Sequence, residues 1–271
     1  MAVGRRQDLD SISFHAAMGI LSAAAVLLIT APTAIVLIVS FTDGYSLKFP
    51  PPGYSVRWYV ALADAWQIQD AAWNSLQAAV LSTLVSILFT VPAAFAVARS
   101  KSAAARKLES LFMSPLVLPA LAFGLSALMY FSLIGIPLSL TTVVIGHVVV
   151  CAPYVFRTTL ASLSQLDPSL LECSASLGAS RIYTYRRVVL PLIGGGIMAG
   201  GFIAFMSSFD NVPVSLFLSD ARNEMLPIRM WQTMENTLDV RVAAVSGVLI
   251  LFSLALMLLM ERFAGLSRRM R

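Results

Sequence analysis

Residues 166–192, which read LDPSLLECSASLGASRIYTYRRVVLPL, form the one long polar interval in the C-terminal two-thirds of the chain. Residues 110–156 before it contain no Asp, Glu, Lys or Arg, and residues 192–209 after it contain none either. A polar segment between two such apolar runs has to lie outside a lipid bilayer. Its capping residues and its glycine nevertheless predict ordered structure, so the functional question is what this stretch contacts.

The composition indicates an integral membrane protein. Of the 271 residues, 58% are hydrophobic and only 12% are charged, whereas a soluble domain carries roughly 25% charged residues. The apolar runs exceed the roughly 20 residues that a helix needs to cross a bilayer. Segments of alternating polarity, which are typical of transmembrane β-barrels, do not occur, so all spans are expected to be α-helices.

Six transmembrane helices with short loops are expected. The uncharged block 110–156 is too long for one helix, and Gly135-Ile136-Pro137 divides it. Prolines, among them Pro115 and Pro119, are expected to kink the second to fourth spans. The expected spans are residues 16–41, 71–98, 110–134, 138–160, 192–218 and 242–260. The chain then divides into a tail, first helix and outer loop (1–70), a transmembrane core (71–262) and a basic tail (263–271).

The basic residues predict the orientation of these spans. All of the 19 Lys and Arg residues fall on one side, except Lys48, Arg57, Arg222, Arg229 and Arg241. Because basic residues accumulate in cytoplasmic loops, both termini and residues 166–192 are expected in the cytoplasm. The net charge of +5 is explained by topology, and nucleic-acid binding is not expected.

The outer segment 42–70 contains FPPPGYSVRWY at residues 49–59. Its three prolines fix an extended path, and its aromatic residues suit the interface between lipid and water. Two interpretations stay open: a loop capped by a short helix that lies on the membrane, or a docking surface for an external partner.

The first half of the polar stretch is predicted to be a short helix. Asp167 is a suitable N-cap and Pro168 a suitable first helical residue. Leu170, Leu171, Ser174 and Leu177 then recur at helical spacing and form one stripe. Gly178 is expected to end this helix, because glycine takes a left-handed conformation without strain.

The second half is predicted to be another short helix, capped by Ser180 and beginning at Arg181. One face would carry Ile182, Tyr185 and Val189, and another face Arg186 and Arg187. Pro191 is expected to end this helix and to start the fifth span. Two amphipathic helices this short are unstable alone. Spacing alone leaves open whether they lie on lipid headgroups or in the groove of a protein.

A family resemblance favours the groove. Glu172, Ala175 and Gly178, followed after nine residues by Val188, Leu190 and Pro191, resemble the EAA motif of permease subunits of type I ABC importers. The departures are Cys173 and Ser174 in place of two alanines and Val188 in place of isoleucine. The resemblance implies that the helix pair couples to a dimeric ATPase subunit through Glu172, Cys173, Ser174, Ala175, Gly178, Val188, Leu190 and Pro191. The chain contains no G-x-x-x-x-G-K-[ST], the phosphate-binding loop of many ATPases, so ATP hydrolysis is expected in that partner.

Two further segments resemble one branch of this family. The segment FPPPGYSVRWY and the segment SSFDNVPVSLFLS, residues 207–219, are similar to spermidine/putrescine-type permeases, specifically the second of two paired permeases. The resemblance implies a second permease subunit, a periplasmic solute-binding protein and a bacterial inner membrane. Its implied solute is a small cation such as a polyamine, and related members of the branch move other small zwitterionic solutes.

Asp210 is the one carboxylate well inside a predicted span. Because a buried charge is costly in a membrane, it usually faces a cavity or a partner. Asp210 and its neighbour Asn211 are therefore candidate residues of a cation pathway, and a packing hydrogen bond is the alternative. His147 lies in the middle of the fourth span, where an interhelical hydrogen bond is the expected role.

Two other classes of protein fit the sequence less well. Ser126 within Gly124-Leu125-Ser126-Ala127, with His147 as its base, would suggest an intramembrane serine protease, but this leaves the polar stretch unexplained. An ion-coupled secondary transporter would need more buried ionisable groups than Asp210 and His147. Cys151 and Cys173 are not expected to form a disulfide, because one lies in a span and the other in the polar stretch. No metal-binding motif occurs, and neither a metal nor a cofactor is expected.

Overall fold

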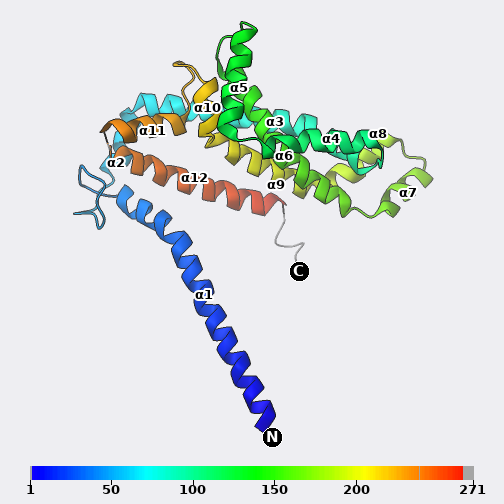
Figure 1. Ribbon diagram of the computed structural model, residues 1–271, viewed down its shortest axis with the longest axis horizontal. Helices are drawn as coiled ribbons and strands as arrows, with labels where there is room; N and C mark the ends of the chain where they lie inside the picture. The colour runs from blue at the N-terminus through cyan, green and yellow to red at the C-terminus, as the bar shows by residue number, and fades with distance from the viewer. Residues whose placement is uncertain (1, 238, 265–271) are drawn as a thin grey trace. The chain divides into compact units, whose positions relative to one another are not determined.

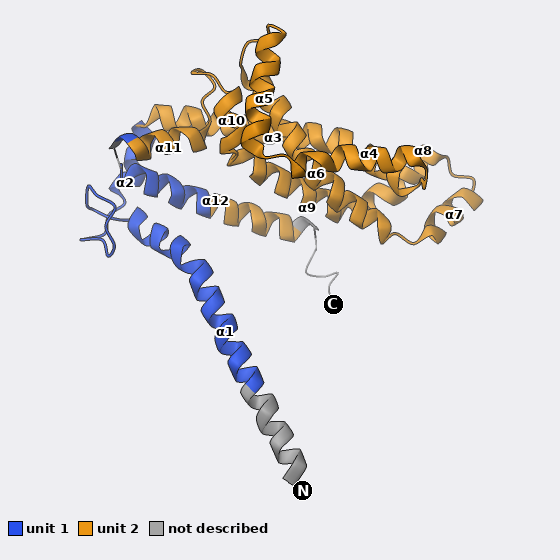
Figure 2. Cartoon of the chain, in the orientation of Figure 1, with its two compact units in different colours: residues 1–64, 236–250 blue, residues 65–235, 251–271 orange. Residues whose placement is uncertain are grey.

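The computed structural model describes residues 2–237 and 239–264, with side chains from 14 to 236 and from 239 to 262. These residues form helices and turns without a β-strand, apart from one isolated bridge between Thr42 and Tyr54. The all-helical fold class is therefore confirmed. The chain forms two compact units, residues 1–64 with 236–250 and residues 65–235 with 251–271 (Figure 2). The division at residues 70 and 262 stays a prediction, because these units are grouped by contact and not by topology.

Five helical stretches in the described part of the chain are long and apolar enough to cross a membrane. They are Phe14–Ser40 within α1 (Ala2–Ser40), Trp66–Ala98 (α3), Leu140–Ser164 (α6), Arg181–Phe209, and Arg241–Arg262 within α12 (Arg241–Ala264). A sixth span is possible if a bent helix pair is counted as one span. The first, second, fourth and sixth predicted spans coincide with four of these stretches, with boundaries shifted by a few residues. The fifth predicted span, 192–218, overlaps the stretch Arg181–Phe209, which begins and ends about ten residues earlier.

The third predicted span is wrong as a single straight helix. The chain instead forms α4 (Ala103–Met113), a 3₁₀ turn η2 (Ser114–Val117) and α5 (Ala120–Leu133), and the pair is bent by 105°. Pro115 lies in the 3₁₀ turn and Pro119 is the N-cap residue of α5. Each proline removes a backbone donor and clashes with the preceding turn, so the two together break the helix and do not merely kink it.

Three helices, α3, α6 and α9 (Leu190–Phe209), pack against one another and form the centre of the second unit (Figure 1). Glycines let α9 approach α6 closely. A Cβ atom at Gly200 would lie 2.9 Å from Cα of Val155, and one at Gly196 would lie 2.9 Å from the carbonyl oxygen of Thr158. The spacing Gly196-x-x-x-Gly200 thus places two small residues where the helices approach each other closely.

One apolar cluster joins the ends of several helices near residues 166–192. Its buried members include Phe156 of α6, Val189 and Ile193, and α4 adds Ala105. The ring of Phe112 stacks on Phe156 at 5.0 Å between centroids. This cluster packs the helices that flank the polar stretch into one body.

The first unit contains α1, the outer loop, α2 (Arg57–Ala61), the 3₁₀ turn η1 (Leu62–Asp64) and the first part of α12. Ser40 and the Tyr59 hydroxyl are hydrogen-bonded at 2.6 Å. The Arg57 guanidinium lies 4.2 Å from the centre of the Tyr45 ring and 4.6 Å from that of Trp58. The predicted short helix in the outer loop is therefore present as α2.

Candidate functional site

The polar stretch begins with α7 (Pro168–Ser176), at the predicted position. The Asp167 carboxylate accepts a hydrogen bond from the backbone N–H of Ser169 at 2.9 Å. This bond holds the pKa of Asp167 below its ordinary value. With Pro168 as the first helical residue, both predicted start signals are confirmed.

Gly178 ends α7 in a left-handed conformation with φ of +77°. The N–H of Ala179 donates to the carbonyl of Ser174 at 3.1 Å, and the N–H of Gly178 donates to that of Ala175 at 2.9 Å. These two bonds define a Schellman motif, which satisfies carbonyls that a helix end would otherwise leave free. The turn after α7 is thus fixed by backbone geometry.

The second helix, α8 (Arg181–Thr184), begins as predicted, because Ser180 accepts a hydrogen bond from the N–H of Tyr183 at 3.3 Å. A contact that sequence reasoning missed then joins the two helices. The hydroxyls of Ser174 and Thr184 are hydrogen-bonded at 2.7 Å, and both side chains are buried. We call this pair of hydroxyls the clasp. Ten residues separate its members across a turn, and no spacing rule connects them.

The prediction that Pro191 ends the second helix is wrong. The chain continues from Arg181 to Phe209 as one helical stretch, through a π-helical segment η3 (Tyr185–Val189). The N–H of Leu190 donates to the carbonyl of Tyr185, five residues earlier. Proline has no N–H and its ring clashes with the carbonyl four residues before it. A wider turn before Pro191 relieves that clash, which accounts for the π-turn without a break.

A groove of about 710 Å³ lies between α7 and α8. Its lining includes Leu170, Cys173, Leu177, Tyr183 and Val188. The side chain of Leu177 is 87% exposed and that of Tyr183 is 57% exposed. The helix pair therefore presents an apolar, uncovered face within the described chain.

Of the predicted coupling residues, Cys173, Ser174, Gly178 and Val188 line this groove, and the others do not. The side chains of Glu172, Ala175 and Pro191 are exposed, and Leu190 is partly buried. The prediction that Ile182, Tyr185 and Val189 share one face is wrong for Ile182. Val189 is fully buried, whereas Ile182 is 72% exposed.

The fifth predicted span is interrupted at Asp210, between α9 and α10 (Val212–Leu218). The side chain of Asp210 is exposed in the single chain. Asn211 caps α10: its side-chain oxygen accepts from the N–H of Val214 at 3.0 Å, and its amide donates to the carbonyl of Ser207 at 3.3 Å. The contacts of Asn211 thus favour the packing alternative, whereas Asp210 is available to a solute or a partner.

His147 is buried, and both of its ring nitrogens are engaged. Nδ1 is 2.8 Å from the Ser208 hydroxyl of α9, and Nε2 is 3.0 Å from the Ser215 hydroxyl of α10. The predicted interhelical hydrogen bond is therefore confirmed, with partners that the sequence did not indicate. Ser126 is exposed on α5 and is not among these partners, so a Ser126–His147 catalytic pair is wrong.

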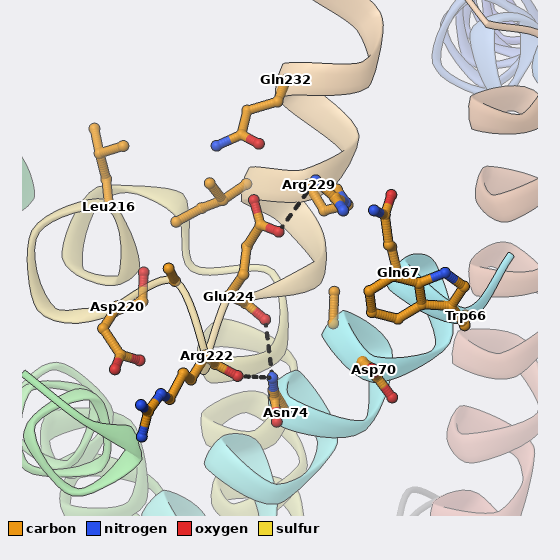
Figure 3. A pocket seen from close by; sticks show the side chains of 14 residues that line it. Trp66, Gln67, Asp70, Asn74, Leu216, Asp220, Arg222, Glu224, Arg229 and Gln232 are labelled. Atoms are coloured by element: carbon orange, nitrogen blue, oxygen red, sulfur yellow. Dashed lines mark hydrogen bonds and ion pairs between the residues drawn. The ribbon is translucent and has the colours of Figure 1, made fainter.

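A second hollow, of about 800 Å³, was not foreseen (Figure 3). Its walls come from the start of α3, from residues 219–224 and from α11 (Leu226–Thr237). Asn74 donates to the carbonyls of Arg222 at 3.4 Å and Glu224 at 3.3 Å, and Glu224 pairs with Arg229 at 3.4 Å. The exposed ring of Trp66 stands at its rim. These contacts hold the segment before α11 against α3.

The fold and the polar stretch together define an all-helical membrane protein with an ordered helix pair inserted between two spans. The family model described as "Binding-protein-dependent transport system inner membrane component" matches residues 71–270. The chain belongs to this family and is a permease component of an ABC importer.

Relatives and solved structures agree with this assignment. The spermidine/putrescine transport system permease protein PotC of Haemophilus influenzae is 32% identical over 235 residues, 85% of this chain and 89% of PotC. The putrescine transport system permease protein PotI of Escherichia coli is 28% identical over 227 residues, 81% of this chain and 80% of PotI. A chain of a bacterial alginate ABC transporter, solved with an alginate-bound periplasmic protein, is similar in fold with a TM-score of 0.72. It is 17% identical, and 97% of each chain is covered.

Proposed function

We propose that the chain is the second permease of an ATP-driven polyamine importer in a bacterial inner membrane. It would receive a solute such as spermidine or putrescine from a periplasmic binding protein and release it into the cytoplasm. The observation that carries the proposal is the α7–α8 pair, which is internally fixed by a turn and the clasp yet leaves an apolar groove uncovered. An exposed apolar surface on an ordered element is typical of a docking site.

The α7–α8 pair would dock on a separate ATPase subunit, one of a dimer. The α7–α8 pair can transmit a movement of the ATPase to the membrane helices only if the pair itself stays rigid. The Schellman motif and the clasp supply that rigidity. The movement would reach α9 through the π-turn and reach α4 and α6 through the apolar cluster around Phe156. ATP binding can drive transport in this way only by favouring one of two arrangements over the other.

The distribution of basic residues supports an orientation with both termini and α7–α8 in the cytoplasm. In that orientation the hollow beside Trp66 and Asn74 belongs to the outer face. Its mixed charges, including the Glu224–Arg229 pair, suit a polar and reversible contact with a binding protein. A second permease, paired with this chain, would complete the solute path.

Similarity to PotC and PotI over most of the chain supports a polyamine as the solute. Asp210 offers an exposed carboxylate at the break between α9 and α10, which suits a cationic amine. Asp210→Asn should lower spermidine uptake by the complete transporter at unchanged protein level. Unchanged uptake would assign Asp210 to packing. Uptake of a zwitterionic solute in place of polyamines would support the alternative substrate class.

The coupling role is tested by two glycines with the same backbone conformation. Gly178 and Gly135 have φ of +77° and +73°, and a Cβ atom at either position would meet nothing within 4 Å. Gly178→Asp and Gly135→Asp therefore impose similar backbone strain and add the same charge. Gly178→Asp should abolish ATP-dependent uptake in vesicles that contain the ATPase, whereas Gly135→Asp should retain it.

Membrane insertion of both variants is the control. Normal transport by Gly178→Asp would disprove the coupling role of α7–α8. Uptake that runs on an ion gradient without ATP would instead identify a secondary transporter.

A further inference from the structure

A third surface hollow, of about 560 Å³, lies along α8 and the π-turn. It is lined by Ser180, Ile182, Tyr183, Arg186 and Arg187. It shares Ser180 and Tyr183 with the apolar groove between α7 and α8, but it adds two adjacent arginines. The coupling role proposed above makes no use of this basic surface.

The two arginines are held on the outer side of the helix. Tyr185 directly before them packs edge-on against the Phe95 ring, with 4.8 Å between centroids. Val189 after them is fully buried in the apolar cluster. Both guanidinium-bearing side chains are exposed. Neither takes part in the ion pairs found among the described residues, which join Arg229 to Glu224 and Arg241 to Asp239.

Their depth in the membrane follows from the length of α9. This helix comprises 20 residues from Leu190 to Phe209, none of them charged. At 1.5 Å per residue it is about 30 Å long, the thickness of the hydrocarbon core of a bilayer. Arg186 and Arg187 precede Leu190 by about one turn, so they lie at the level of the phospholipid phosphates.

We propose that this hollow binds the headgroup of an anionic phospholipid, such as phosphatidylglycerol, in the cytoplasmic leaflet. Two adjacent guanidinium groups suit a phosphate, because each can donate paired hydrogen bonds to its oxygens. Ile182, 72% exposed, and Tyr183, 57% exposed, offer apolar and aromatic surface beside the cations. A phospholipid can contact both the cationic and the apolar surface, whereas a soluble anion would contact only the cationic one.

The position of this lipid would give it influence on transport. The hollow lies on the segment that joins α8 to α9, so a bound headgroup would brace the π-turn. The inference rests on the orientation proposed above. It deepens the proposed function by adding a lipid ligand to the coupling region.

The test measures lipid binding directly on the assembled transporter. The complete complex is prepared in bilayer discs of phosphatidylcholine with added phosphatidylglycerol, and retained lipid is counted by native mass spectrometry. Basic residues near an anionic surface contribute about fivefold each in affinity. Arg186→Gln with Arg187→Gln should therefore lower phosphatidylglycerol retention by about 25-fold. The same pair changed to lysine should retain most of the binding.

Arg106→Gln with Lys107→Gln is the matched control, because it removes two adjacent exposed charges from α4. An equal loss in this control would overturn the proposal, since it would indicate a diffuse charge effect. Unchanged binding in the Arg186/Arg187 variant would also overturn it. The proposal would also be overturned if inorganic phosphate released more of the bound lipid than chloride does at the same ionic strength.

Loss of the ATPase subunit from the Arg186/Arg187 variant with unchanged lipid binding would assign the hollow to a protein interface and refute the lipid site. Spermidine uptake by the wild-type complex is measured separately. Failure of that uptake with intact lipid retention would count against the proposed solute and not against this site.

Discussion

The two hydroxyls of the clasp, on Ser174 and Thr184, have different roles in their hydrogen bond, so removing one should cost more than removing the other. Thr184 Oγ1 is 3.2 Å from the carbonyl oxygen of Ser180, to which it donates its proton. Its oxygen therefore accepts the proton of Ser174 at 2.7 Å. Thr184→Val removes the acceptor and leaves a buried serine hydroxyl without this partner. Ser174→Ala removes only the donor, and Thr184 keeps its bond to Ser180.

The two substitutions should consequently differ in cost. A buried polar group left without its partner costs about 1–3 kcal/mol, whereas loss of one hydrogen bond with the other partner satisfied costs about 0.5–1.5 kcal/mol. The double variant leaves neither hydroxyl, and the N–H of Thr184 that donates to Ser180 at 2.9 Å remains. It should therefore cost less than the sum of the single variants, by about 1 kcal/mol.

Hydrogen exchange of the amides of Leu177 and Ala179 measures this cost, because both donate across the end of α7. In bilayer discs, exchange of these amides should accelerate about 30-fold in Thr184→Val, for a cost of about 2 kcal/mol. In Ser174→Ala it should accelerate about fivefold, for a cost of about 1 kcal/mol, since 1.4 kcal/mol is a factor of ten. Thr30→Val, which removes a hydroxyl bonded within α1, is the control and should leave these amides unchanged.

Equal acceleration by the two single variants would refute the assigned direction of the hydrogen bond. An additive double variant would show that the hydroxyls do not act as a pair. The second outcome would remove the clasp as the element that keeps α7 and α8 together.

Three further predictions concern the helices around the clasp. Gly200→Ala should lower the thermal stability of the purified complex, because overpacking costs about 1–3 kcal/mol. Gly194→Ala, where a Cβ atom would meet nothing within 4 Å, should not lower it, and equal losses would contradict close packing. Pro191→Ala restores an N–H and should convert the π-turn to α-helix, which turns α8 by about 100° relative to α9. Spin–spin distances between Ile182 and α4 should change, and unchanged distances would disprove the proline effect. The cap of α7 should weaken as pH falls through the depressed pKa of Asp167, below 3.8. Asp167→Asn should abolish that pH dependence of amide exchange at the helix start, and an identical profile in both proteins would contradict the assignment.

The local features of the polar stretch were predictable because their causes lie within a few residues. Asp167, Ser180 and Gly178 each act on a backbone group within about five positions, so spacing is sufficient to identify them. Five of the six predicted apolar spans and the role of His147 were predictable for a similar reason. A membrane leaves few alternatives for a long uncharged run or a buried imidazole.

The features that escaped prediction depend on contacts or on competing proline effects. The partners of His147, Ser208 and Ser215, come from other helices and have no sequence signal. The break between α4 and α5 and the π-turn before Pro191 show prolines with opposite outcomes. Two prolines four residues apart, Pro115 and Pro119, break a helix, whereas the single Pro191 is absorbed by one wide turn.

The distribution of stiffness indicates where the coupling region changes shape. The α7–α8 pair is held by a Schellman motif and the clasp, and α9 is held to α6 at Gly196 and Gly200. The π-turn lies between the helix pair and α9 in the chain. Its carbonyls accept from donors one residue further along than in an α-helix. A π-turn can move along a helix by exchange of hydrogen bonds without loss of one. We therefore expect the junction at η3 (Tyr185–Val189) to be where rotation of the helix pair is converted into movement of α9.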